Sequence, residues 1–246
     1  MRVIAVALAL MAGAASAADL NICVEGAYPP FSYTTEDGTV QGFDIDVANA
    51  LCAELGTECA LVKSDWDGII PALLERKCDA IIASMSITEE RQQVIDFSTK
   101  YYHTPPRFVG PAGMSVADLS DAVVGVQRGT IHQVFMEGEF SGVELRLYGT
   151  QDEAYLDLAA GRIDAIMADS IASLFGFLQT EAGAGFEFFG PEYTMPKYHG
   201  LGVGVGVRKG EEDLRNSFSH AIGQIRGNGV YQEINDKYFD FDIFGG

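Results

Sequence analysis

The sequence predicts an α/β protein of two doubly wound lobes, and three observations carry this prediction. Candidate strands and helices alternate along the chain, as they do in sheets covered by helices. The strands are continuous apolar runs, which suits parallel strands buried on both faces. Residues 73–84 also resemble residues 158–169, because each stretch contains a helix end, a short turn with a basic residue and an apolar strand. Two such units in one chain indicate two similar lobes.

Hydrophobic patterning assigns the individual elements. An apolar 3.6-residue period through Phe43, Val47, Leu51 and Leu55 predicts a helix that ends at Gly56. The other expected helices cover residues 67–76, 89–96 and 151–160, the last of them closed by Gly161. The expected strands lie at residues 20–24, 60–63, 123–126, 144–148 and 163–168.

Two stretches are expected to connect the lobes. Residues 107–111 leave the first lobe, and the glycine–valine stretch 200–207 returns to it. The second stretch contains G-x-G-x-G, but its helix begins only near Glu211, so the context of a nucleotide-binding loop is missing. Because glycine permits large dihedral changes, we expect a flexible strand between the lobes. The first lobe would comprise residues 18–106 and 201–246, and the second residues 107–200.

The N-terminus has the pattern of a cleavable secretory signal. Arg2 precedes an apolar run over residues 3–11, and small residues end in Ala15, Ser16 and Ala17. We therefore expect a signal peptide over residues 1–17, cleaved near Ala17. The apolar run is too short to span a bilayer, and no later segment reaches 18 apolar residues. The mature chain is expected to be exported without a membrane anchor.

Composition and motif content exclude several classes of function. The 246 residues carry 16 Lys and Arg against 35 Asp and Glu, a net charge of −19, whereas nucleic-acid binding needs a basic excess. There is no C-x-x-C, and the histidines show no ligand spacing. No G-x-S-x-G or recognisable triad occurs. We expect no nucleic-acid partner, no metal ion or other cofactor, and no catalytic residues.

Four cysteines in an exported chain predict disulfides. Cys52 and Cys59 bracket Gly56, so a bond between them would tie the helix end to the strand that follows. Cys23 and Cys78 would form the remaining pair, and the sequence leaves open whether they are bonded.

The repeated units suggest where a ligand lies. Ser84 and Asp169 follow equivalent strands, one in each lobe. Ligands of doubly wound sheets bind beyond the carboxyl ends of the strands, so these side chains would face each other across a cleft. Serine and aspartate are also common helix N-caps, so capping of the segments that follow is the alternative role for both. The matched pair favours the ligand site.

Three ordered motifs carry a resemblance to a known family. They are EGAYPPF at residues 25–31, GFDID at 42–46 and SMSITEER at 84–91. With these motifs the chain resembles the family 3 solute-binding proteins of polar amino-acid ABC importers, over about residues 19–244. Within that family it is most similar to the lysine/arginine/ornithine and histidine binders, with echoes of the opine binders. The C-x6-C pair of Cys52 and Cys59 also matches the disulfide of that subgroup.

The resemblance implies a fold and a role. The fold would be the periplasmic binding protein type II fold, with two lobes joined by a two-strand hinge. The protein would be a periplasmic monomer without enzymatic activity that closes on an amino acid and presents it to an inner-membrane ABC permease.

The resemblance also assigns residues to the ligand's backbone groups. Arg91 would clamp the α-carboxylate bidentately, which suits a planar guanidinium. Ser86 and Thr130 would add donors to the same carboxylate. Asp169 would accept from the α-ammonium, helped by Ser84. Because an unpaired buried charge is costly, ligands that lack either group should be rejected.

The side-chain pocket would decide specificity. Tyr28 and Trp66 match the aromatic pair that sandwiches the ligand side chain in the binders of basic amino acids, where cation–π contact is available. Glu25 matches the acidic position that meets the distal cation.

Four positions depart from the pattern of that subgroup. Glu25 stands where the lysine/arginine binders have the shorter aspartate, and Ala83 replaces a common serine. Gln127 and His132, itself a candidate ligand contact, also differ from the commonest residues. Arginine, ornithine, lysine, histidine and opines all remain open as ligands, and the long acid favours arginine.

An enzyme on the same scaffold, similar to cyclohexadienyl dehydratase, is the rival interpretation. Arg91 does not separate the two, since a prephenate-type substrate also has a carboxylate. Asp169 does, because such a substrate has no ammonium that needs a buried acid. A binding protein that serves a receptor in place of a transporter is a third possibility that the sequence leaves open.

Overall fold

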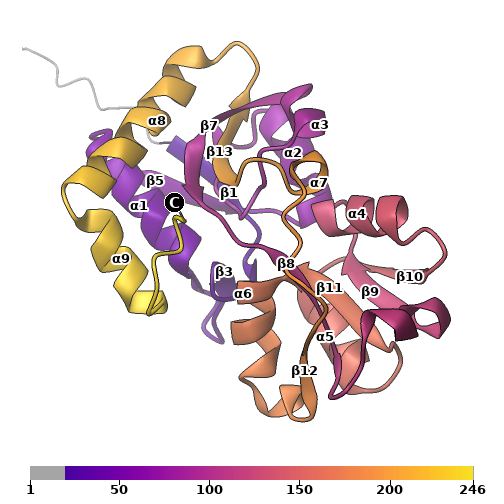
Figure 1. Cartoon of the computed structure of the whole chain (residues 1–246). Coiled ribbons are helices and arrows are strands. Elements are labelled where there is room, and N and C mark those ends of the chain that lie inside the picture. The colour runs from indigo at the N-terminus through magenta and orange to yellow at the C-terminus, as the bar shows by residue number, and fades with distance from the viewer. Residues whose placement is uncertain (1–19, 246) are drawn as a thin grey trace, which may run out of the picture.

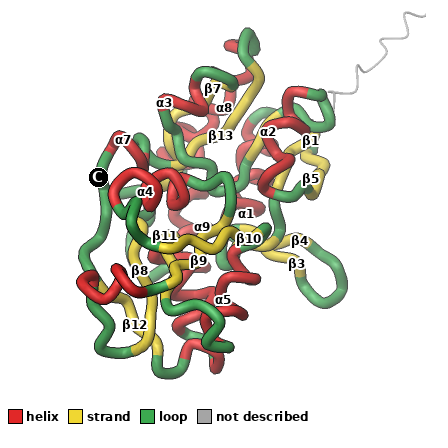
Figure 2. The backbone as a smooth tube through the Cα atoms, turned by 90° about the vertical axis from the view of Figure 1, so that its right-hand side faces the viewer, coloured by secondary structure: helices red, strands yellow, loops and turns green. Residues whose placement is uncertain are grey.

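The computed structural model describes residues 20–245, and the signal peptide expected at residues 1–17 lies outside this range. The described residues form two five-stranded sheets and a small sheet of three short strands. Figures 1 and 2 show the two large sheets in separate lobes, with α4 (Ile131–Glu139) and α7 (Pro196–His199) near their junction. This arrangement confirms the predicted α/β class with two doubly wound lobes.

The first sheet has the strand order β5-β1-β6-β13-β7. Its strands are β1 (Leu20–Val24), β5 (Cys59–Lys63), β6 (Ala80–Ile81), β7 (Ile95–Tyr102) and β13 (Val203–Arg208). β1 pairs in parallel with β5 and β6, whereas β13 runs antiparallel to β6 and β7. The helices of this first lobe are α1 (Phe43–Glu54), α2 (Trp66–Leu74), α3 (Glu89–Gln92), α8 (Glu212–Gly227) and α9 (Val230–Tyr238). The small sheet consists of β2 (Ala27–Tyr28), β3 (Ser32–Thr34) and β4 (Val40–Gln41).

Alternation along the strands divides the core of the first lobe between the two faces of its sheet. Ile22 and Val24 pack with α1, α8 and α9 on one face, while Cys23 packs with α2 on the other. Helices therefore cover both faces, which is why apolar side chains of β1 are buried on both sides of the sheet.

The second sheet has the order β10-β9-β11-β8-β12. Its strands are β8 (Pro106–Pro111), β9 (Val123–Gln127), β10 (Glu144–Tyr148), β11 (Ala165–Asp169) and β12 (Phe186–Phe189). α4 packs on one face and α5 (Gln151–Ala159) on the other. The remaining helical elements of this second lobe are α6 (Ser170–Ser173), α7 and the short turns η1 (Val116–Asp121), η2 (Leu174–Leu178) and η3 (Glu181–Gly183). The strands of the two repeated stretches, β6 and β11, occupy the middle of their sheets, so the sequence repeat reflects two similar lobes.

The chain passes between the sheets at residues 103–105 and 200–202, because β8 belongs to the second sheet and β13 to the first. Of the connection expected at residues 200–207, only residues 200–202 lie between the sheets. The expectation of a flexible strand is wrong from Val203 onward, since every residue of β13 is buried. The other expected connection, residues 107–111, lies within β8 of the second sheet. The glycines of β13 leave room for neighbouring side chains to pack closely against the strand. A Cβ on Gly204 would lie 2.8 Å from Ile87 Cδ1, and one on Gly206 would lie 3.1 Å from Ile95 Cδ1.

The helix expected over residues 89–96 is also wrong in length. α3 ends at Gln92, and β7 begins at Ile95. Ile95 and Phe97 alternate into the core beside β13, so strand pairing replaces the second turn of the expected helix. The strand expected at residues 163–168 begins only at Ala165.

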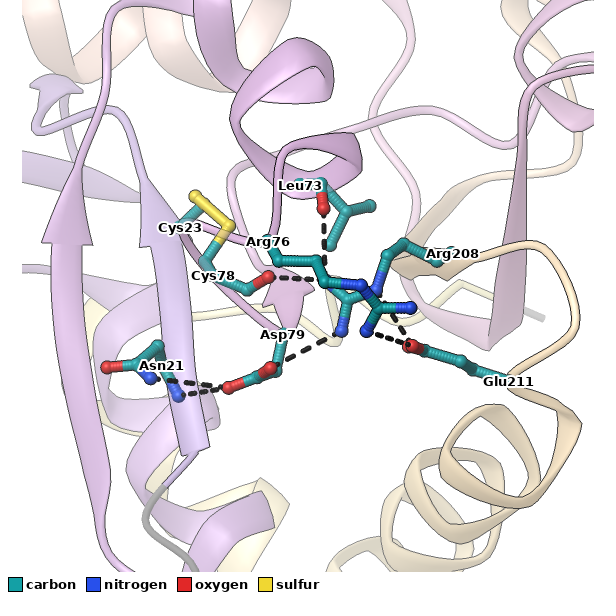
Figure 3. A network of polar contacts seen from close by, with 8 residues as sticks. All are labelled: Asn21, Cys23, Leu73, Arg76, Cys78, Asp79, Arg208 and Glu211. Atoms are coloured by element: carbon teal, nitrogen blue, oxygen red, sulfur yellow. Dashed lines mark hydrogen bonds and ion pairs between the residues drawn. A yellow bond between two sulfur atoms is a disulfide. The ribbon is translucent and has the colours of Figure 1, made fainter.

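The end of the first sheet opposite the carboxyl ends of its parallel strands is closed by a polar network (Figure 3). Arg208, at the end of β13, donates to the carbonyl oxygens of Leu73 and Cys78 at 2.9 and 2.5 Å. Its guanidinium also pairs with Asp79 and Glu211. Cys78 is bonded to Cys23 of β1, and Cys52 at the end of α1 is bonded to Cys59 at the start of β5.

Candidate ligand-binding site

A cavity lies between the two sheets, at the carboxyl ends of their parallel strands. Side chains from both lobes line it. The first lobe contributes Glu25, Tyr28, Trp66, Ala83, Ser84, Ser86 and Arg91, and the second contributes Gln127, Thr130, Ile131, His132 and Asp169. All nine candidate ligand residues from the sequence therefore line one cavity. Ile131 was not singled out from the sequence.

Arg91 is the cationic side chain of the cavity. It lies in α3, whose first turn is capped by Thr88. Its Nη1 donates to the carbonyl oxygen of Ser86 at 3.1 Å, and its guanidinium lies 5.3 Å from the centre of the Trp66 ring. Burial lowers the pKa of Arg91 to about 10, so the group stays charged at neutral pH. Trp66 therefore offers one face to a cation of the protein itself, an arrangement that the sequence did not predict.

The first turn of α4 lines the same cavity. Thr130 is its N-cap: the hydroxyl accepts from the Gln133 N–H at 3.4 Å and donates to the Gln127 carbonyl at 2.7 Å. The Thr130 hydroxyl is thus engaged within the protein. The group that faces the cavity here is the positively polarised N-terminus of α4. Such an end favours a carboxylate.

Asp169 is a buried carboxylate at the end of β11. It occupies the N-cap position of α6, yet its side chain makes no capping bond. Instead, Oδ2 accepts from the Tyr28 hydroxyl of the other lobe at 2.8 Å, and Oδ1 lies 4.0 Å from His132 Nε2. Burial raises the pKa of Asp169. Burial and the charge of Arg91 lower the pKa of His132 to about 3, so His132 is neutral at pH 7 and does not neutralise Asp169.

Ser84 is held by a carboxylate that sequence reasoning missed. Its backbone is left-handed, with a φ of 55°, so it does not cap a helix. The hydroxyl donates to Asp44 Oδ2 at 2.9 Å, and Asp44 also accepts from Tyr101 at 3.0 Å. Burial raises the pKa of Asp44 to about 6. Because the hydroxyl proton points to Asp44, the Ser84 oxygen remains an acceptor for a donor in the cavity. The only sequence signal for Asp44 was its place in the GFDID motif.

Glu25 follows β1 and is only 5% exposed. Its Oε1 accepts from Gln127 Nε2 of the second lobe at 2.5 Å, and the same nitrogen lies 3.2 Å from the Gly149 carbonyl. Burial raises the pKa of Glu25 to about 7, and the negative charges of Asp152 and two other aspartates add to the rise. A cation beside Glu25 would reverse this effect by favouring the ionised form.

Charge in the cavity is therefore uneven. Arg91 supplies one positive group, and Glu25 and Asp169 supply two acidic groups. Within residues 20–245, no lysine or arginine pairs with either acid. No cluster of potential metal ligands occurs among these residues either, and no helix among them is both long and apolar enough to cross a membrane.

Comparison with known proteins identifies the family. The bacterial extracellular solute-binding proteins, family 3, match residues 20–241. The chain belongs to this family. Among solute-binding proteins, it is 48% identical to the L-arginine-binding protein of Pseudomonas aeruginosa, with 98% of this chain and 96% of the relative covered. It is 38% identical to the lysine/arginine/ornithine-binding periplasmic protein of Escherichia coli, with 97% of each covered.

Solved structures of solute-binding proteins agree with the fold. A Salmonella typhimurium periplasmic binding protein described for its high arginine specificity matches with a TM-score of 0.85 at 30% identity, over 91% of this chain and 100% of that one. An ancestral amino-acid-binding protein described as a precursor of cyclohexadienyl dehydratase matches with a TM-score of 0.79 at 30% identity, over 90% and 95%. Both likenesses support the predicted type II fold.

Proposed function

We propose that this solute-binding protein holds a cationic L-amino acid, arginine above others, between its two lobes and delivers it to an inner-membrane ABC permease. The observation that carries the proposal is the charge of the cavity: one cation, Arg91, and two acids, Asp169 and Glu25. A basic amino acid presents the complement, one carboxylate and two cations. The relatives known as an L-arginine-binding protein and a lysine/arginine/ornithine-binding periplasmic protein support the same class of ligand.

The backbone groups of the ligand meet the first part of this pattern. Arg91, the Ser86 region and the first turn of α4 can bind an α-carboxylate, since a guanidinium and a helix N-terminus both favour an anion. Asp169 and the acceptor oxygen of Ser84 can receive an α-ammonium. The ammonium would also remove the cost of keeping the Asp169 carboxylate ionised while buried.

The side chain of the ligand meets the second part. Tyr28 and the free face of Trp66 can cover an aliphatic stem, and Glu25 can pair with a guanidinium, an ammonium or an imidazolium at its end. Arginine is favoured because its planar fork can bond a carboxylate bidentately. Ornithine, lysine, histidine and opines carry a suitable cation as well.

Closure of the lobes is the proposed mechanism. Tyr28, Glu25 and Arg91 come from the first lobe, and Asp169, Gln127 and α4 from the second. A ligand shifts a hinge equilibrium only by its difference in affinity for the two states. A ligand that spans both lobes binds the closed state more tightly than the open state, because it makes its full set of contacts only when the lobes close.

The rival interpretation, an enzyme similar to cyclohexadienyl dehydratase, is disfavoured by Asp169. A substrate without an ammonium would leave this buried carboxylate without a cation, at considerable cost. We therefore propose a binding protein that performs no chemistry, exported to the periplasm by a signal peptide cleaved near Ala17 and acting as a monomer.

A thermal-shift screen of the purified mature protein against the twenty amino acids and several opines tests the proposal. A ligand present at about 100 times its Kd stabilises the fold by about 2.7 kcal/mol, which corresponds to a rise in Tm of about 5–10 °C for a protein of this size. We expect such shifts with arginine and at least one other cationic amino acid, and none with glutamate or leucine. Shifts confined to acidic or aliphatic amino acids would refute the cationic assignment.

A further inference from the structure

An ion pair joins the two lobes outside the cavity. Arg128 donates from Nε and Nη2 to the same oxygen, Asp67 Oδ2, at 2.7 and 2.5 Å. Arg128 directly follows β9 of the second lobe, where its N–H bonds the Tyr148 carbonyl at 2.9 Å. Asp67 lies in the first turn of α2 in the first lobe. Neither Arg128 nor Asp67 lines the cavity.

The pair continues a seam of contacts that begins at the ligand residues. The carbonyl oxygen of Gly129 accepts from Trp66 Nε1 at 3.1 Å and lies 3.5 Å from Arg91 Nη2. Residues 128 and 129 of one lobe therefore meet residues 66, 67 and 91 of the other. Separation of the lobes would break these contacts together.

We propose that the Arg128–Asp67 pair is a latch that raises ligand affinity without touching the ligand, by stabilising the closed arrangement of the lobes. The inference rests on the proposed function in one respect, that the ligand is held by closure. It is independent of which amino acid is bound.

The size and character of the effect follow from exposure. The side chains of Arg128 and Asp67 are 49% and 42% exposed, so the pair is partly screened by solvent and salt. Apparent affinity scales with the closed fraction. A partly exposed pair should therefore change Kd about two- to fivefold at low ionic strength. The change should fall mainly on the dissociation rate, because the pair stabilises the closed arrangement from which the ligand must escape.

The signs of two single substitutions separate a latch from long-range electrostatics. Removing a positive charge near the cavity with Arg128→Gln would tighten binding of a cation if only the field mattered, while Asp67→Asn would weaken it. A latch requires that both variants weaken binding. It also requires that the double variant is no weaker than either single variant, because the partners act as one unit.

Lys209 provides the matched control. Its Nζ lies 2.7 Å from Asp96 Oδ1, and its side chain is 47% exposed, close to the value for Arg128. Both partners belong to the first sheet or its adjoining turn, so this pair does not bridge the lobes. Lys209→Gln should leave ligand dissociation unchanged.

The test measures dissociation of L-arginine and L-citrulline by stopped flow from the mature protein and these variants, at about 0.02 M and about 0.5 M NaCl. We expect Arg128→Gln and Asp67→Asn to speed dissociation of both ligands by the same factor, about two- to fivefold at low salt and close to one at high salt. Rates equal to the parent at low salt, or opposite effects of the two substitutions on arginine, would overturn the latch.

A second measurement tests the latch independently of the proposed ligand class. Spin labels attached after Glu54→Cys and Glu144→Cys report the distance between the lobes, since all four native cysteines are paired. If the parent bound neither arginine nor citrulline, the proposed ligand class would fail. The latch would then be judged in the ligand-free protein. Arg128→Gln and Asp67→Asn should lengthen the interlobe distances where Lys209→Gln does not, and identical distances in all variants would refute it.

Discussion

Glu25 is the side chain on which selectivity for a cation should depend. Glu25→Gln keeps the shape of the residue and removes its charge. Loss of one partner of a buried charge pair typically costs about 2–5 kcal/mol, or about 30- to 5,000-fold in affinity. We expect this loss for arginine, whereas neutral citrulline should lose little or gain. Titration calorimetry on the variant measures both.

Arg91→Ala is the control for Glu25→Gln. It should weaken arginine and citrulline alike, because both share the α-carboxylate that Arg91 is proposed to bind. If Glu25→Gln kept the affinities for arginine, ornithine, lysine and histidine within threefold of the parent, Glu25 would not be the selectivity acid.

The raised pKa of Glu25 also predicts a pH dependence of binding. Burial raises this pKa from 4.5 to about 7 in the folded protein, and a bound cation lowers it again. Below pH 7 a proton must therefore leave when arginine binds, so the affinity should fall by up to tenfold per pH unit as the pH drops toward 5. Calorimetry across this range measures the slope.

Two controls distinguish the contribution of Glu25 to this pH dependence from the contributions of other titrating groups. The pKa values of His132 and His199 are lowered by burial to about 3 and about 4, so both stay neutral across this range. The pKa of Asp44 is raised to about 6, and its titration should change the affinities for all ligands alike. The pH profile of citrulline binding measures this shared contribution. An arginine profile that stays equally steep in Glu25→Gln would assign the proton elsewhere.

The network around Arg208 joins four segments of the first lobe, and its role should be purely structural. Arg208→Ala removes the guanidinium that donates to the carbonyls of Leu73 and Cys78 and that pairs with Asp79 and Glu211. Asp79 keeps only its bonds from Asn21, and Glu211 keeps only the exposed Arg76. We expect the free energy of unfolding to fall by about 3 kcal/mol, measured by urea denaturation. Arginine affinity should change less than twofold, because the network closes the opposite end of the sheet from the cavity.

Arg76 offers a comparison for that measurement. Its side chain is exposed and pairs with the same Glu211 at 3.5 Å. Arg76→Ala should alter the free energy of unfolding by about 0.5 kcal/mol or less. Equal losses in the two variants would show that the buried carbonyls do not depend on Arg208.

Elements with a clear local pattern were predictable from sequence, and elements defined by their neighbours were not. The helix through Phe43 and Leu51 has a local apolar period and forms as expected. The glycine–valine strand β13 has the composition of a flexible linker, yet Ile87 and Ile95 fill the space that a Cβ would need. Its burial depends on residues more than one hundred positions away.

The candidate site shows the same division. Local pattern pointed to Ser84 and Asp169, and the family motifs supplied the other candidate residues. The bonds from Gln127 to Glu25 and from Ser84 to Asp44 span 102 and 40 positions, and no local pattern encodes them. Burial raises the pKa values of Glu25 and Asp44, and these hydrogen bonds oppose part of the rise. The electrostatics of the site therefore required the folded structure.

The net charge of −19 gives the whole molecule a field that attracts cations. Such a field raises the association rate of a cationic ligand and is screened by salt. The association rate of arginine should therefore fall about tenfold between low salt and about 1 M NaCl, while that of citrulline stays nearly constant. Stopped-flow mixing measures both rates. The same salt dependence for the two ligands would mean that the overall charge does not guide binding.

Trp66 is the one tryptophan of the chain, and it lies where the lobes meet. Its indole N–H donates across the junction to Gly129, and the guanidinium of Arg91 lies over its ring. Opening of the lobes would exchange the carbonyl acceptor for water and change the surroundings of the excited state. The emission of this single tryptophan, excited selectively over the tyrosines, can therefore report closure in the unlabelled protein. The chain is thus a natural starting point for an optical amino-acid sensor.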